Sequence, residues 1–232
     1  MMHMKIASVV FTALFVILMP VVLLLTDVQL VAYDRDYYRA EYYKYGIPEH
    51  IGMSMDNLME STEQLLLYLD NKRDDLNFKA SFNHGEEEFF SPRDKLHMID
   101  VRGLFVKGRL FRNISLIYIA IFIILLFREK PFRNQLRKLA RHGIAISAAG
   151  IAPVIVLIIL MKIDFYRYFT VFHEIFFTND LWLLDPAADR LINIFPQDFF
   201  TDMAFSISYL YIGEMAAILI CSLIALKLVK SN

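Results

Sequence analysis

Four long apolar windows constrain the fold of this chain more than any other feature of its sequence. They cover residues 6–26, 110–127, 144–161 and 203–226 and are nearly free of charged side chains. About 20 residues of helix cross the hydrocarbon core of a bilayer, so each window is close to the length of one span. The windows predict an all-α membrane protein with four transmembrane helices. The first window is longer than the apolar region of a signal peptide, and we expect it to be retained.

The charges between the windows predict how the chain is oriented in the membrane. The connecting loop 128–143 is short and strongly basic; its cations are Arg128, Lys130, Arg133, Arg137, Lys138 and Arg141. Short basic loops stay in the cytoplasm, so we expect this loop and both termini to be cytoplasmic. The polar segments 27–109 and 162–202 then lie together on the outer face of the cell membrane as an extracellular cap. The net charge of -1 gives no indication of nucleic-acid binding.

The first outer segment contains two helix-start signals. Ser54 fits the N-cap of an amphipathic helix, because apolar residues recur after it at helical spacing. Ser91 fits a second N-cap, with Pro92 in the first turn and Asp94 at the position that faces back to the cap. Six tyrosines lie between residues 33 and 45. They are typical of an interfacial belt or an amphipathic helix, and part of a pocket wall is the alternative.

The second of these helices bears the first candidate catalytic histidine. His97 and Asp100 are three residues apart and share a face, and Arg93 lies one turn before His97. Gly103 and Gly108 weaken the helix further along, so we expect a break before the second span.

The second outer segment is strongly aromatic and bears the other candidate. His173 lies in the sequence FTVFHEIFF, and a helix there would gather one aromatic face: Phe169, Phe172, His173, Phe176 and Phe177. An imidazole in an apolar wall stays neutral and can act as a base near pH 7. Trp182 is either an interfacial anchor or a pocket wall, and Asp185 precedes a proline that predicts a fixed turn. Both outer segments therefore supply a histidine, with acids nearby, to the same side of the membrane.

A predicted loop at 80–90 offers a competing histidine. His84 is followed by glutamates, and His84, Glu86 and Glu88 together would suit a metal-dependent membrane hydrolase. No HExxH or CxxC pattern supports this reading, and we expect no metal and no other cofactor. There is no P-loop, GxGxxG or GxSxG motif, and the single Cys221 allows no disulfide within the chain.

Three stretches of this sequence resemble a known family. SPRDKLHMIDV (91–101), FHEIFF (172–177) and DLWLLDPAADRLINIFPQDFF (180–200), together with four spans, are similar to the lipoprotein intramolecular transacylases of Gram-positive bacteria. The resemblance covers essentially the whole chain. It implies four transmembrane helices with an extracellular cap, and two catalytic histidines where the cap meets the membrane. By position these would be His97 and His173, with His84 as the alternative to His97.

The resemblance also implies a reaction. The family moves the sn-2 acyl chain of a diacylglyceryl lipoprotein onto the α-amine of the lipoprotein's N-terminal cysteine and so makes the lyso-form. Its partners would be that lipoprotein and membrane lipids, and we expect a monomer. Arg93, Asp100, Trp182 and Asp185 would support the histidines. Direct attack by the amine and an acyl-imidazole intermediate both fit the sequence, and a non-catalytic lipid-binding cap protein is a further alternative.

Overall fold

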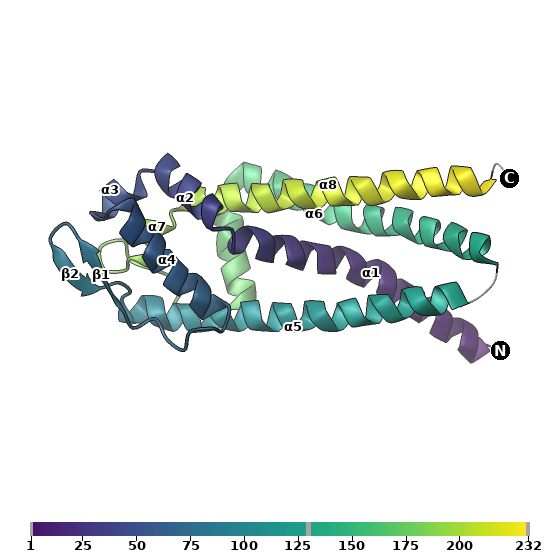
Figure 1. The fold of residues 1–232 in the computed structure, drawn as a ribbon, viewed down its shortest axis with the longest axis horizontal. Coiled ribbons are helices and arrows are strands. Elements are labelled where there is room, and N and C mark those ends of the chain that lie inside the picture. The colour runs from purple at the N-terminus through teal and green to yellow at the C-terminus, as the bar shows by residue number, and fades with distance from the viewer. Residues whose placement is uncertain (1, 129–130, 231–232) are drawn as a thin grey trace. The chain divides into compact units, whose positions relative to one another are not determined.

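A computed structural model describes residues 2–128 and 131–230. Glu129 and Lys130 of the predicted basic loop lie outside these ranges. Among the described residues, four helices are long and apolar enough to cross a membrane. They are α1 (Met2–Ala32), α5 (Pro92–Arg128), α6 (Phe132–Phe176) and α8 (Gln197–Lys230) (Figure 1). The predicted all-α membrane fold with four transmembrane helices is confirmed.

The chain forms two compact units, and each has its own apolar core. The bundle unit comprises the described residues of Met1–Gln29, Arg109–Leu160 and Phe205–Asn232. The aromatic unit comprises Leu30–Gly108 and Met161–Ala204. Both histidines predicted to be catalytic belong to the aromatic unit.

Aromatic stacking and close backbone approach hold the bundle unit together. Phe15 of α1 stacks on Phe122 of α5 with ring centroids 4.1 Å apart. Ser147 of α6 donates a hydrogen bond of 3.0 Å to the backbone carbonyl of Met215 in α8. A Cβ atom at Gly150 of α6 would collide with side chains of α8 and crowd α1. Glycine therefore allows three helices to approach closely, as in other membrane bundles.

The long helices exceed the thickness of a bilayer. The 37 residues of α5 correspond to about 55 Å of helix, against a hydrocarbon core of ~30 Å. We propose that the predicted apolar windows cross the bilayer; nearly all of their residues lie in the bundle unit. The predicted loop 128–143 is largely helical instead, because α6 already begins at Phe132. The residues of α5 before Arg109 and of α6 after Leu160 then lie outside the spans.

The predicted break in α5 is wrong. The helix is continuous through Gly103 and Gly108 to Arg128. A glycine in a helix interior costs about 1 kcal/mol relative to alanine. Val101 and Phe105 pack against the core of the aromatic unit, and burial of such side chains contributes a similar or larger stabilisation.

Four shorter helices complete the helical part of the aromatic unit. They are α2 (Arg35–Lys44), α3 (Ile47–Ile51), α4 (Met55–Leu69) and α7 (Leu191–Ile194). Ser54 caps α4 as predicted, because its side chain accepts a hydrogen bond from the backbone of Asn57. The tyrosine-rich stretch contains the amphipathic helix α2. Its Tyr38 and Tyr42 lie in the core, where the hydroxyl of Tyr42 hydrogen-bonds that of Thr62 at 2.9 Å.

The predicted loop at 80–90 is instead a small hairpin. Strand β1 (Lys79–Phe82) pairs antiparallel with β2 (Gly85–Glu88), and two residues form the turn. Phe82 packs beneath the guanidinium of Arg190, which lies 4.1 Å from the ring centroid. The sequence did not predict the hairpin, because strands of four residues show little alternation of apolar and polar side chains. In addition, the residue that packs on it, Arg190, lies about a hundred positions further along the chain.

Asp94 connects the start of α5 to a distant part of the aromatic unit. Ser91 and Asp94 form the predicted reciprocal cap, with two hydrogen bonds of 3.0 Å. The buried carboxylate of Asp94 also accepts hydrogen bonds from the backbone of Arg190 and Leu191. One acid therefore orients the helix that bears His97.

Replacing this acid should loosen the unit. In Asp94→Ala, three backbone donors lose their acceptor, one buried and two partly buried; a fully buried donor without a partner costs about 1–3 kcal/mol, and a partly buried one costs less. We expect a clear fall in the thermal unfolding midpoint of the detergent-solubilised protein. Asp94→Asn keeps an acceptor oxygen and should lose less. An Asp94→Ala variant as stable as the parent would contradict this role.

Candidate active site

The structure brings His97 and His173 together. His97 lies on α5 and His173 near the end of α6, and their ring centroids are 6.1 Å apart. Only 6% of the His97 surface and 7% of the His173 surface are exposed. Two imidazoles from segments 76 positions apart in the sequence thus form one buried pair inside the aromatic unit.

A short capped helical stretch presents His173. α6 leaves helical geometry at Asp164, where φ is -159° and ψ is 89°. The carboxylate of Asp164 accepts a hydrogen bond of 3.0 Å from the backbone of Arg167, as a helix N-cap does. A new helical stretch therefore begins after Asp164 and places His173 two turns further on.

The two imidazoles have different hydrogen-bonding environments. Nδ1 of His173 donates to the backbone carbonyl of Phe169 at 2.7 Å. This bond assigns the proton to Nδ1 and leaves Nε2 with a free lone pair. Nδ1 of His97 is buried and has no hydrogen-bond partner among the described residues. The pair therefore retains ring nitrogens that can engage a substrate.

Aromatic rings surround His173. Its ring centroid lies 4.3 Å from that of Phe169, 4.9 Å from Trp182 and 5.4 Å from Phe172. Phe177 contacts both histidines, at 5.5 Å from His173 and 5.3 Å from His97. We call these four rings the aromatic box. They offer apolar surface to an acyl chain and few hydrogen-bond partners to water.

This environment keeps both imidazoles neutral. Burial above all, with smaller contributions from His173 and Arg93, lowers the pKa of His97 to about 4, although Asp100 opposes the shift. Burial also lowers the pKa of His173, although the hydrogen bond to Phe169 opposes that shift. Both groups are therefore unprotonated at pH 7 and able to accept a proton.

The four residues expected to support the histidines have different positions. Trp182 lies against His173 and donates from Nε1 to the backbone carbonyl of Asn179 at 3.0 Å. The carboxylate of Asp100 accepts a hydrogen bond of 2.8 Å from the side chain of Asn179. The guanidinium of Arg93 donates at 3.1 Å to the carbonyl of Leu183. These three therefore converge on one turn, which follows α6.

Asp185 is occupied within its own turn. Its carboxylate accepts a hydrogen bond of 2.9 Å from the backbone of Ala187, and its backbone NH donates to Asp189 at 2.8 Å. The predicted turn is present, but these bonds give Asp185 a local role. Sequence reasoning missed Asn179, and its only signal was a TND turn pattern directly after a helix.

His84 lies in an exposed hairpin turn. Its ring stacks on Phe82 at 5.6 Å, and Nε2 lies 3.6 Å from a carboxylate oxygen of Glu87. No group of three histidine, cysteine or acidic side chains within the described residues is arranged to hold a metal ion. The geometry thus favours His97 over His84 as the partner of His173.

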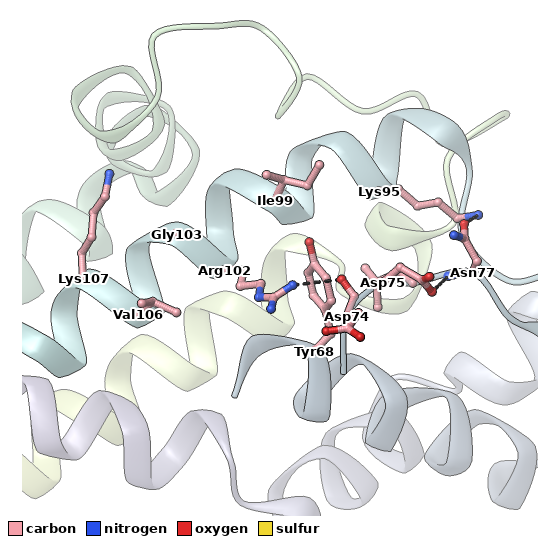
Figure 2. Close-up of a pocket in the computed structure, with 11 residues that line it drawn as sticks. Tyr68, Asp74, Asp75, Asn77, Lys95, Ile99, Arg102, Gly103, Val106 and Lys107 are labelled. Carbon is pink, nitrogen blue, oxygen red and sulfur yellow. Dashed lines mark hydrogen bonds between the residues drawn. The ribbon is translucent and has the colours of Figure 1, made fainter. Parts of the chain in front are cut away.

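A cavity of about 560 Å³ lies on another face of α5 (Figure 2). Its polar groups already bond one another: Arg102 donates to the carbonyl of Asp74 at 3.0 Å, and Lys95 donates to Asn77 at 2.9 Å. The guanidinium of Arg102 also stacks on Tyr68, 4.6 Å from the ring centroid. Neither histidine lines this cavity. The cavity is thus distinct from the histidine pair, where Nδ1 of His97 has no hydrogen-bond partner among the described residues.

The fold and this site define a polytopic helical membrane protein with a buried pair of neutral histidines. The model of the family described as lipoprotein intramolecular transacylase Lit matches residues 13–200. The chain belongs to this family and is a membrane-integral transacylase. A comparison with curated proteins found no match.

Solved structures support the fold. The membrane-integral lipoprotein intramolecular transacylase Lit from Bacillus cereus is 21% identical, covers 100% of both chains and superposes with a TM-score of 0.82. A variant of that protein with a histidine replaced by arginine is 20% identical over 97% of this chain and 94% of its own, with a TM-score of 0.75. A variant with a histidine replaced by alanine is 20% identical over 99% and 98%, with a TM-score of 0.77.

The burial of His97 has a measurable consequence for stability. In the folded chain His97 binds a proton near pH 4, whereas an unfolded histidine binds one near pH ~6.5. Between these values the unfolded state holds more protons, so stability falls as the pH is lowered. We expect the unfolding midpoint to drop from pH 7 to pH 4.5, and to drop less in His97→Gln. The exposed His84→Gln should retain the parent's dependence; a His97→Gln profile that matches the parent's would contradict the assignment.

Proposed function

We propose that the chain transfers the sn-2 acyl chain of a diacylglyceryl lipoprotein to the α-amine of the lipoprotein's N-terminal cysteine, with His97 and His173 as the catalytic residues. The observation that carries this proposal is the buried histidine pair, with ring centroids 6.1 Å apart and Nδ1 of His97 without a hydrogen-bond partner among the described residues. The aromatic box supports it, because its rings suit an acyl chain.

The reaction requires one proton to move. The amine attacks the ester carbonyl, so a bond forms between the nitrogen and the acyl carbon, and the bond between the acyl carbon and the sn-2 glyceryl oxygen breaks. Nε2 of His173 accepts the proton that the amine loses and then returns it to the departing glyceryl oxygen. An amine that titrates near pH ~8 is well matched to an imidazole base.

The carbonyl oxygen gains negative charge in the transition state. The neutral ring of His97 donates an N–H to this oxygen, because a hydrogen-bond donor aimed at developing charge lowers the barrier. The hydrogen bond from Nδ1 of His173 to Phe169 fixes the other ring in one tautomer and one orientation. An acyl-imidazole on His173 would use the same groups, since Nε2 is then the nucleophile.

The charge pattern suggests where the reaction takes place. Arg133 and Arg137 lie in the first two turns of α6, beside its short connection to α5, and basic residues next to a span stay in the cytoplasm. We infer that the termini are cytoplasmic and that the aromatic unit is an extracellular cap at the outer surface of the cell membrane, where lipoproteins and membrane lipids are available. Both histidines come from one chain, so a monomer suffices.

Substitution of either histidine tests this function. The change His97→Gln or His173→Gln should lower formation of the lyso-lipoprotein at least ~100-fold, because acid–base groups contribute 10²–10⁴-fold. The measurement is tandem mass spectrometry of a model lipoprotein from cells with and without each variant. The intact mass stays constant, and fragmentation shows one acyl group moved from glyceryl to the N-terminus.

Protein level and membrane insertion are measured in parallel. The matched control is His84→Gln, which should retain the parent's activity. Near-parental amounts of lyso-lipoprotein from both His97→Gln and His173→Gln would contradict the proposal. Loss of the product in His84→Gln alone would place the site at the hairpin.

A further inference from the structure

The turn after α6 covers His173. α6 ends at Phe176, and six residues later the indole of Trp182 lies against the imidazole. The ring centroids are 4.9 Å apart and the ring planes differ by 30°. The position of this turn therefore determines whether the indole of Trp182 covers one side of the His173 ring.

Asn179 makes three hydrogen bonds at the start of this turn. Its side-chain amide donates to Asp100 on α5 at 2.8 Å. Its side-chain oxygen accepts from the backbone of Leu181 at 3.1 Å. Its backbone carbonyl accepts from the indole nitrogen of Trp182 at 3.0 Å. Asn179 thus bonds the turn to α5, stabilises the conformation of the turn and fixes the indole ring that covers His173.

Arg93 holds the other end of the same turn. Its guanidinium donates to the carbonyls of Asp180 and Leu183 and lies 3.5 Å from the carboxylate of Asp180. Arg93 and Asp100 stand one turn before and one turn after His97 on α5. Helix α5, which bears His97, therefore also holds in place the turn whose Trp182 covers His173.

We propose that Asn179 is a positioning residue, which holds Trp182 against His173 through its hydrogen bonds to Asp100 and to the indole. It touches no reacting atom. Its effect on the reaction rests on the proposed function of His173, but its effect on the geometry does not. With the cover in place, the free nitrogen of His173 keeps its direction and water is excluded from one side of the ring.

The fluorescence of Trp182 reports on its contact with His173. Trp182 is the single tryptophan, and a protonated imidazole in contact quenches indole fluorescence. Charged and titratable groups near the contact are Arg93, His97 and Asp100 on α5 and Asp180 in the turn, and Glu174 is the next residue on α6. Replacing Asn179 by alanine changes none of these charges.

Fluorescence of the purified full chain in detergent, without substrate, is followed from pH 8 to pH 4. In the parent we expect the fluorescence of Trp182 to fall as His173 becomes protonated. We call this fall the quenching step, and His173→Gln should remove it. In Asn179→Ala the step should shrink at least about twofold and move toward higher pH, since water then reaches the imidazole. Asn193→Ala is the matched control, because Asn193 donates two hydrogen bonds in the same segment. It should leave the step unchanged.

A swap of the two partners tests the hydrogen bond itself. Asn179→Asp places two carboxylates together, and Asp100→Asn removes the acceptor's charge, so each single variant should weaken the step. The double variant Asp100→Asn with Asn179→Asp restores a donor–acceptor pair and should regain the parent's step. Thermal unfolding identifies variants that have lost the fold.

The acyl-transfer rate separates this inference from the proposed function. We expect kcat to fall about 10-fold in Asn179→Ala with a smaller change in KM, and to recover in the double variant. A folded Asn179→Ala with the parent's quenching step overturns the positioning role, as does a folded double variant that regains nothing. An altered step with an unchanged transfer rate supports the positioning role and counts against catalysis by His173.

Discussion

In the hydrocarbon core of a bilayer there is no water to bond the backbone, so an α-helical protein crosses it on helices whose amides bond one another. α5 and α6 satisfy this requirement and then continue well past the segments that we assign to the membrane. Each extension bears one histidine. Because a helix is stiff and its periodicity is fixed, the side of α5 that packs Val101 and Phe105 into the core also determines where His97 points. Side chains on such elements are placed more accurately than side chains on loops.

Much of this arrangement could be predicted because it depends on local chemistry. Apolar windows identify the spans, and the caps at Ser54 and Ser91 depend on residues within one turn. The adjacency of His97 and His173 followed from topology, since the two outer segments must meet on the same side of four spans. None of these inferences needed a side-chain contact between distant residues.

The features that escaped prediction depend on such contacts. The hairpin at 79–88 is supported by Arg190 over Phe82, and Asn179 reaches Asp100 across 79 positions of sequence. Asp100 was expected to support the histidines, and its carboxylate accepts a hydrogen bond from Asn179, so its influence on the site passes through that residue. Asp185 shows the reverse case, because its turn was predicted but its carboxylate serves the turn alone.

The aromatic box has a consequence for fidelity. An activated ester carbonyl reacts with any nucleophile that reaches it, and water is the most abundant competitor. An attack by water would release the acyl chain as free fatty acid and leave the lipoprotein with one anchor fewer. The rings of Phe169, Phe172, Phe177 and Trp182 offer water little to bond. In the proposed reaction these rings determine whether the acyl chain is transferred to the amine or lost to water, and the histidines determine the rate of transfer.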